Sequence, residues 1–222
     1  MKAADVLAHT RALLLDFDGP VCAVFASIPA SVVADQLRQV LTDGGHVGLP
    51  TVVATCTDPF DVLRYAAKLG DDEARYVEAA FTAHEVEAVS GAKPTEGAHD
   101  LIRAWHTSGR PIAIVSNNSA SAIEAYLDLY DLNRYIDVIS ARNTADTSLL
   151  KPDPYLLRQA INRLNVTPED CVFIGDSISD IHAARGAGVR SIGYANSPRK
   201  TATLTEAHAV TRTMDGLVAV AP

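Results

Sequence analysis

From about residue 94 to residue 195, short apolar segments alternate with longer amphipathic ones, and this alternation limits the fold more than any other feature of the chain. The apolar segments are continuous and rich in Val and Ile, which is typical of strands buried on both faces of a sheet. They cover residues 111–117, 135–141, 171–176 and 190–195. The segments predicted as helices cover residues 95–109, 119–130, 153–165 and 178–188. Right-handed crossovers between such strands produce a parallel sheet, so the sequence predicts an α/β fold.

Residues 20–92 interrupt this alternation. The apolar segment at 11–16 has the composition of the later strands and belongs with them. After it come segments predicted as helices, with little strand signal between them, at 31–41, 58–70 and 71–89. One short piece, 51–55, is ambiguous between helix and strand. We therefore expect an α/β core domain formed by residues 1–19 and 93–222, with a helical domain inserted at 20–92.

The composition argues against several classes of protein. Hydrophobic residues make up 48% and charged residues 21% of the 222 residues, which are ordinary values for a globular protein. No window approaches the roughly 18 apolar residues of a membrane-spanning helix, and the N-terminal segment does not resemble a secretory signal. The formal charge is −8 without a basic cluster, so we expect no nucleic-acid partner. Three cysteines without metal-ligand spacing predict reduced thiols and a cytoplasmic location.

Polar side chains follow the predicted strands at the point where each strand ends. In chain order they are Asp16 and Asp18, then Ser116 and Asn117, then Lys151, then Asp176 and Asp180. Simpler interpretations exist for each group: a solvated turn for the first pair, a helix N-cap for Ser116, and favourable N-terminal acids for the last pair. However, ligands of open α/β sheets bind beyond the carboxyl ends of the strands, where all of these residues are expected. A shared site is the better interpretation.

These residue types suit phosphoryl chemistry. Several carboxylates at one edge form an oxygen-rich site for Mg²⁺, which relieves their mutual repulsion and can hold a phosphoryl oxygen. A lysine adds a point charge for phosphate, and a serine hydroxyl or backbone N–H groups at a helix N-terminus can bind the remaining oxygens. One aspartate can then attack phosphorus and form an aspartyl-phosphate, while a second aspartate transfers protons.

The ordered motifs D-x-D-G, S-N, K-P and G-D-S-x-x-D resemble those of the haloacid dehalogenase (HAD) superfamily, in its phosphatase branch. The resemblance implies a Rossmann-like core and a Mg²⁺ cofactor. It also implies that Asp16 is the nucleophile and Asp18 the general acid and base. Ser116 and Asn117 would contact the substrate phosphate, and Lys151 would pair with both the phosphate and Asp16.

For the metal, the resemblance implies that Asp16 binds through its carboxylate, Asp18 through its carbonyl, and Asp176 through its carboxylate. Asp180 would support the metal from behind its direct ligands or bind it through a water molecule. The presence of Asp18 favours phosphoryl transfer over carbon–halogen cleavage, because the dehalogenase members lack an acid at that position.

The helical insert resembles the cap of phosphoglycolate phosphatase-like members, and we expect it to act as a lid. The hinge departs from the common pattern at Pro20, which lacks a backbone donor, and at Ala23, where relatives carry an acid. Helical periodicity places Lys68 on a solvated face beside Asp61 and Arg64. His84 is expected to be a packed histidine.

We therefore expect a Mg²⁺-dependent phosphatase that hydrolyses a small phosphorylated metabolite. Two alternatives stay open at this point. A phosphomutase on the same scaffold would return the phosphoryl group to a sugar instead of water. A non-catalytic regulator would keep the fold and bind a metabolite, although the catalytic residue types are all present. The sequence names neither the substrate nor the oligomeric state.

Overall fold

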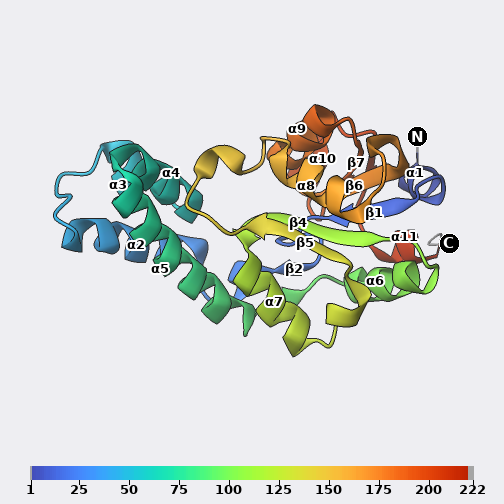
Figure 1. The fold of residues 1–222 in the computed structure, drawn as a ribbon, viewed down its shortest axis with the longest axis horizontal. Coiled ribbons are helices and arrows are strands. Elements are labelled where there is room, and N and C mark those ends of the chain that lie inside the picture. Colours follow the sequence, from blue (N-terminus) through green and yellow to red (C-terminus); the bar gives the residue numbers. More distant parts are fainter. Residues whose placement is uncertain (1, 220–222) are drawn as a thin grey trace.

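A computed structural model describes residues 2–219, and within them six parallel strands form one sheet, shown in Figure 1. The strand order is β5-β4-β1-β6-β7-β8. The strands are β1 (Ala12–Leu15), β4 (Ile112–Ser119), β5 (Val138–Arg142), β6 (Cys171–Gly175), β7 (Arg190–Tyr194) and β8 (Ala209–Thr211). The predicted α/β fold with a parallel sheet is confirmed. The edge strand β8 was not predicted, because a strand of three residues is too short to show a periodicity.

Helices cover both faces of this sheet. They are α1 (Ala3–Ala8), α6 (Ala98–Thr107), α7 (Ala120–Leu129), α8 (Tyr155–Leu164), α9 (Ile178–Ala187), α10 (Pro198–Thr203) and α11 (Asp215–Val218). Short 3₁₀ turns lie at η1 (Val24–Ala26), η2 (Asn133–Tyr135), η3 (Thr147–Leu149) and η4 (Pro168–Asp170). Among the described residues, no helix has both the length and the apolar character needed to cross a membrane.

The alternation of β1 shows how the sheet is buried on both sides. Leu13 and Leu15 belong to one apolar cluster with Trp105 of α6 and Tyr126 of α7. Leu14 belongs to a second cluster, packed against α8 and α9. Side chains two apart point to the same face of a strand, so both faces of β1 are covered and its carboxyl end is the place where polar groups can gather.

The insert forms a helical layer beside the sheet, at the left of Figure 1. Its helices are α2 (Ala30–Asp43), α3 (Thr51–Ala54), α4 (Pro59–Leu69) and α5 (Asp71–Val89). The ambiguous piece is therefore helical. An apolar cluster of its own includes Leu37, Leu63 and Phe81. The two chain connections to the core pair as antiparallel strands, β2 (Cys22–Ala23) and β3 (Lys93–Pro94).

Candidate active site

The carboxyl ends of β1, β4 and β6 lie side by side, because β1 pairs with both of the other strands. One cavity of about 270 Å³ lies at this edge. It is lined by every site residue that the sequence predicted, namely Asp16, Asp18, Ser116, Asn117, Lys151, Asp176 and Asp180. The residues at the predicted strand ends therefore lie together at a single site.

Asp16 follows β1 directly and is only 6% exposed. Its Oδ1 atom lies 2.7 Å from Nζ of Lys151 and accepts a 2.8 Å hydrogen bond from the backbone N–H of Phe17. Its Oδ2 atom accepts no hydrogen bond from any other described residue. Burial, together with the nearby charge of Asp180, raises the pKa of Asp16, although Lys151 opposes the shift. One oxygen of this carboxylate is thus held in place and the other is available.

Lys151 is 3% exposed and serves two carboxylates at once. Besides Asp16, its Nζ atom donates to Oδ1 of Asp180 at 2.6 Å. Burial alone would lower the pKa of Lys151, but the charges of the two aspartates outweigh it and raise that pKa. The lysine lies in a turn, four residues before α8 begins at Tyr155. The predicted helix at 153–165 therefore starts slightly before α8, and Lys151 precedes both starts.

Asn117 fixes the backbone of Lys151. The Asn117 Oδ1 atom accepts a 2.8 Å hydrogen bond from the N–H of Lys151, and its Nδ2 atom donates to the Lys151 carbonyl at 3.1 Å. Because both ends of the amide are used in this way, the side chain of Asn117 is not free to bind a ligand. Any contact between Asn117 and phosphate would use its backbone N–H.

Asp180 belongs to the first turn of α9. Its Oδ2 atom accepts hydrogen bonds from the N–H groups of Asp176 at 3.0 Å and Ser177 at 2.9 Å, and forms a capping box with Ser177. Burial by itself would raise the pKa of Asp180, but Lys151 and the hydrogen bonds from Ser177 lower it. Both oxygens are therefore occupied, and Asp180 holds the loop and the lysine in place.

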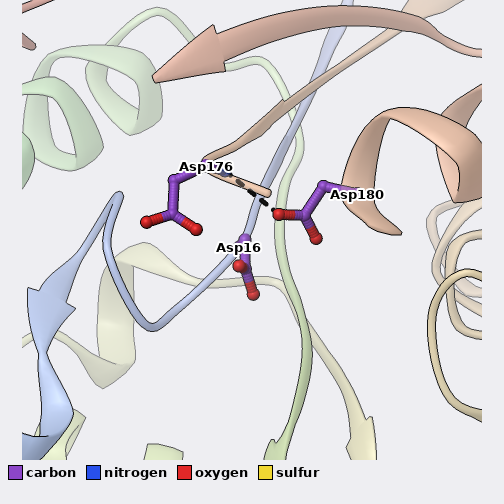
Figure 2. Close-up of side chains that lie close together, drawn as sticks. All are labelled: Asp16, Asp176 and Asp180. Carbon is purple, nitrogen blue, oxygen red and sulfur yellow. Dashed lines mark hydrogen bonds between the residues drawn. The ribbon is translucent and has the colours of Figure 1, made fainter. Parts of the chain in front are cut away.

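Asp176 lies close to Asp16, on the other side of it from Asp180, as Figure 2 shows. One carboxylate oxygen from each of Asp16, Asp176 and Asp180 lies within 4.8 Å of the others. Burial raises the pKa of Asp176 to about 6, against the charge of Lys200, whose Nζ atom bonds to Oδ2 of Asp176. Gly19 is required beside this group: its φ is +110°, and a Cβ atom there would stand 2.1 Å from Oδ2 of Asp176.

Asp18 points into the same cavity from the turn after β1. Its Oδ1 atom accepts a 2.9 Å hydrogen bond from the N–H of Val24, at the entry to the insert. Burial raises the pKa of Asp18. The missing N–H of Pro20 costs this turn no hydrogen bond, because the bonds that close it are donated by the N–H groups of Gly19, Val21 and Cys22.

Two basic side chains at the site were not found by sequence reasoning. Arg64 of α4 keeps the exposed contact with Asp61 that its solvated face predicts, but it also lines the cavity, which the sequence did not indicate. Lys68 on the same helix is exposed as expected. Lys200 of α10 reaches Asp176 across 24 residues of chain, and no motif predicted it. Phe25 also lines the cavity, while Cys22 is buried in the core.

A comparison with protein families shows to which family the chain belongs. Residues 10–188 match a model described as haloacid dehalogenase-like hydrolase. The chain belongs to this family. The superfamily that the motifs indicated is thereby confirmed. The matched residues include all the site residues that the sequence predicted, from Asp16 to Asp180.

Curated relatives match only part of the chain. A phosphoglycolate phosphatase of Salmonella paratyphi A is 34% identical over 94 residues, which are 42% of this chain and 36% of that protein. The pyrophosphatase PpaX of Halalkalibacterium halodurans is 32% identical over 105 residues, which are 46% of this chain and 48% of that protein. The match thus covers less than half the length of each of these relatives.

Solved structures share the fold over nearly the whole chain. CbbY from Rhodobacter sphaeroides, in complex with phosphate, superposes with a TM-score of 0.66 at 21% identity, covering 94% of this chain and 96% of that one. A HAD-superfamily hydrolase of Geobacter sulfurreducens gives a TM-score of 0.60 at 20% identity, covering 96% and 97%. These likenesses concern the fold, including the helical insert.

Proposed function

We propose that this protein is a Mg²⁺-dependent phosphatase that hydrolyses a small phosphate monoester through an aspartyl-phosphate on Asp16. One observation carries the proposal: Oδ1 of Asp16 is held by Lys151 while Oδ2 stays free beside the cavity. A carboxylate fixed in this way is oriented for attack on phosphorus. The relatives named as phosphatases support the same reaction class.

The residues present fit a Mg²⁺ ion. Asp176 keeps one carboxylate oxygen that no described residue bonds, and one carboxylate oxygen from each of Asp16, Asp176 and Asp180 lies within 4.8 Å of the others. Asp16 would offer the metal Oδ1, which Lys151 also contacts, because Oδ2 is the attacking atom. The close approach that Gly19 permits brings a backbone segment against Asp176. Asp16, Asp176 and the carbonyl of Asp18 would hold the ion, with Asp180 behind them. When bound, Mg²⁺ would neutralise phosphoryl oxygens and reduce repulsion between the carboxylates.

The other residues follow from their positions. Oδ2 of Asp16 attacks phosphorus, and Asp18 protonates the leaving oxygen and later takes a proton from water. The raised pKa of Asp18 suits a group that must carry a proton part of the time. The hydroxyl of Ser116, a residue of β4 that lines the cavity, and the ammonium of Lys151 bind phosphoryl oxygens.

We propose that residues 20–92 form a cap over this site. Phe25, Phe60 and Arg64 of the insert line the cavity together with the carboxylates of the core. A cavity of about 270 Å³ suits a small metabolite rather than a phosphoprotein. Arg64 is the only basic side chain of the insert among the described residues that line the cavity, so the substrate should carry a second anionic group. A cytoplasmic location is consistent with the three free cysteines.

A generic aryl phosphate tests the proposal. The protein should release inorganic phosphate when Mg²⁺ is added, and should stop when a chelator removes the metal. Asp16→Asn is the matched control, since it keeps the shape of the site but lacks the nucleophile. Hydrolysis that survives in Asp16→Asn would refute the mechanism. Transfer of the phosphoryl group to an added sugar phosphate, without release of phosphate, would identify a phosphomutase instead.

A further inference from the structure

A charged cluster outside the cavity joins the insert to the sheet. Arg142, the last residue of β5, is 3% exposed and forms ion pairs with Glu78 and Glu85 of α5. Its guanidinium also lies 4.7 Å from the ring centroid of Phe81 and donates to Oγ1 of Thr82 at 3.3 Å. Four residues on one face of α5 therefore surround a single arginine of the core.

Glu85 and Arg142 also hold the chain that follows Ser116. The carboxylate of Glu85 is fully buried and accepts a 2.9 Å hydrogen bond from Nδ2 of Asn118 and another of 2.9 Å from the N–H of Ser119. Nε of Arg142 donates to the carbonyl of Asn117 at 3.1 Å. Three consecutive residues of the core are thus fixed by one buried ion pair, half of which comes from the insert.

The polarity of these bonds determines how Ser116 is oriented. A carboxylate only accepts hydrogen bonds, so Glu85 selects the NH₂ end of the Asn118 amide. The carbonyl end then faces Ser116 and accepts from its hydroxyl at 3.1 Å. The Oγ atom of Ser116 also accepts from the N–H of Asn118 at 3.3 Å. The single O–H of Ser116 is thus used by Asn118 here, and it would bind phosphate by rotating about the Cβ–Oγ bond towards the cavity. The position of the Oγ atom beside the cavity depends on Glu85, a residue of the insert that does not line the cavity.

We propose that Glu85 and Arg142 are positioning residues, through which helix α5 of the insert fixes Ser116 and its neighbours for phosphate binding. This inference rests on the proposed function, because it assumes that Ser116 binds phosphate. It assigns to the insert a second role besides covering the site: the insert supplies an acceptor without which the phosphate-binding segment is not held in one geometry.

The alternative is that the ion pair only stabilises the fold. Apolar residues of similar size can often replace a buried ion pair without lowering the free energy of unfolding. Removal of only one partner lowers it strongly, because the other charge is left buried and unpaired. The two roles therefore predict different results for a single substitution and for an apolar replacement of the whole pair. Positioning also predicts an effect on phosphate affinity that a stabilising role would not produce.

The first experiment compares Glu85→Gln with Glu87→Gln. Glu87 lies on the same helix, its side chain is 69% exposed, and it touches none of these groups. Binding of inorganic phosphate in the presence of Mg²⁺ is measured by calorimetry at a temperature where each variant is folded. Glu85→Gln should weaken binding about tenfold, the scale of effect found for residues that orient a ligand-binding group, and Glu87→Gln should change it by less than about twofold.

The second experiment uses the double variant Glu85→Met with Arg142→Met, which stays informative if Glu85→Gln does not fold. The melting temperature should return towards that of the wild type, because neither position 85 nor position 142 then carries a buried charge. Glu78 also loses its partner Arg142, but Glu78 is partly exposed and can be solvated. The phosphate affinity of the double variant should still be about tenfold lower than that of the wild type, because Asn118 and Ser119 have lost the carboxylate that accepts their hydrogen bonds.

Wild-type phosphate affinity in a folded double variant would overturn the inference and leave the proposed function intact. A wild-type protein that neither binds phosphate nor hydrolyses an aryl phosphate would instead overturn the proposed function, and the inference with it. The ratio of kcat to KM for the aryl phosphate should fall in parallel with phosphate affinity in the Glu85 and Arg142 variants.

Discussion

Lys151 and Asp16 form a buried ion pair in which Nζ lies 2.7 Å from Oδ1 and leaves Oδ2 of the carboxylate free. The same ammonium bonds Asp180 at 2.6 Å, so a single cation compensates two buried acids. This explains how a strand rich in leucine can end in a carboxylate: the compensating charge comes from a distant segment, fixed in turn by the side chain of Asn117.

Lys151→Met should destabilise the protein strongly. Removing the shared cation leaves Asp16 and Asp180 buried without it, and breaking a buried ion pair from one side costs about 3–5 kcal/mol. Urea denaturation at neutral pH without metal measures the change in the free energy of unfolding. Lys68→Met on the exposed face of α4 is the control and should stay within about 0.5 kcal/mol. A loss of less than about 1 kcal/mol for Lys151→Met would contradict the shared-cation interpretation.

Asp16→Asn and Asp18→Asn should fail at different steps. Asp16→Asn removes the nucleophile, so no phosphoenzyme forms. Asp18→Asn keeps the nucleophile and loses a proton-transfer group, a contribution of about 10²–10⁴-fold. With an aryl phosphate, whose leaving group needs little protonation, Asp18→Asn should accumulate the phosphoenzyme. Mass spectrometry of the quenched protein detects the added phosphoryl group; its presence on Asp16→Asn would show that another residue is the nucleophile.

Mg²⁺ should stabilise the protein more as the pH rises. The pKa of Asp176 is raised to about 6, above its ordinary value, so the metal-free folded protein holds this proton more tightly than the unfolded chain does. The contribution of Asp176 to the free energy of unfolding is fully present below about pH 4 and is lost as the pH rises through about 6. Mg²⁺ binds the ionised form, so its effect on the melting temperature should grow from about pH 5 to about pH 7.

Thermal unfolding with and without Mg²⁺ across this pH range measures the effect. Asp176→Asn is the matched control, because it lacks the titrating carboxylate, and its melting temperature should respond weakly to Mg²⁺ at every pH. A Mg²⁺-induced shift of the wild type that is independent of pH would argue against Asp176 as a ligand.

Lys200→Met should increase the affinity for Mg²⁺. The ammonium of Lys200 bonds Oδ2 of Asp176 and therefore competes with a metal for the negative charge of that carboxylate. Removing it should lower the Mg²⁺ concentration at half-maximal thermal stabilisation by about two- to tenfold. Arg199→Met, an exposed neighbour on the same helix, should leave it unchanged. Weaker Mg²⁺ binding in Lys200→Met would mean that Lys200 supports the metal site instead of competing with it.

Arg64→Ala should alter substrate preference rather than the chemical step. The side chain lines the cavity from α4, and its contact with Asp61 at 3.0 Å lies at the surface. Substrates with a second phosphate or a carboxylate should show a KM raised about tenfold or more, the expected loss of one charge-assisted contact, whereas an aryl phosphate should be little affected. Lys68→Ala is the control on the same helix. Equal losses for all substrates would remove Arg64 from the specificity determinants.

Comparison of a bisphosphate with a phosphorylated carboxylic acid distinguishes the two anionic groups. The substrate whose KM rises more in Arg64→Ala identifies the group that the guanidinium binds. A bidentate contact favours arginine over lysine for either group, so Arg64→Lys should recover only part of the loss.

The sequence alone determined the parallel sheet and the edge that carries the chemistry. Continuous apolar segments report burial on both faces, and the residues that follow them must meet at one edge once the strands are parallel. The positions of Asp16, Lys151 and Asp176 were therefore predictable, and so were the helices of the insert. The predicted helix start at residue 153 differs from Tyr155, where α8 begins, because helix periodicity does not fix the first helical residue.

Only the tertiary structure decided which charged residues are buried and which elements they connect. Arg142 and Glu85 are 57 residues apart and form a buried pair, and Lys200 reaches Asp176 from another helix. A charged residue gives the same sequence signal whether it is solvated or buried against a partner, because periodicity records the face of one element and not what packs against it. The pairing of elements, and with it the contact between α5 and the phosphate-binding segment, is a property of the folded chain.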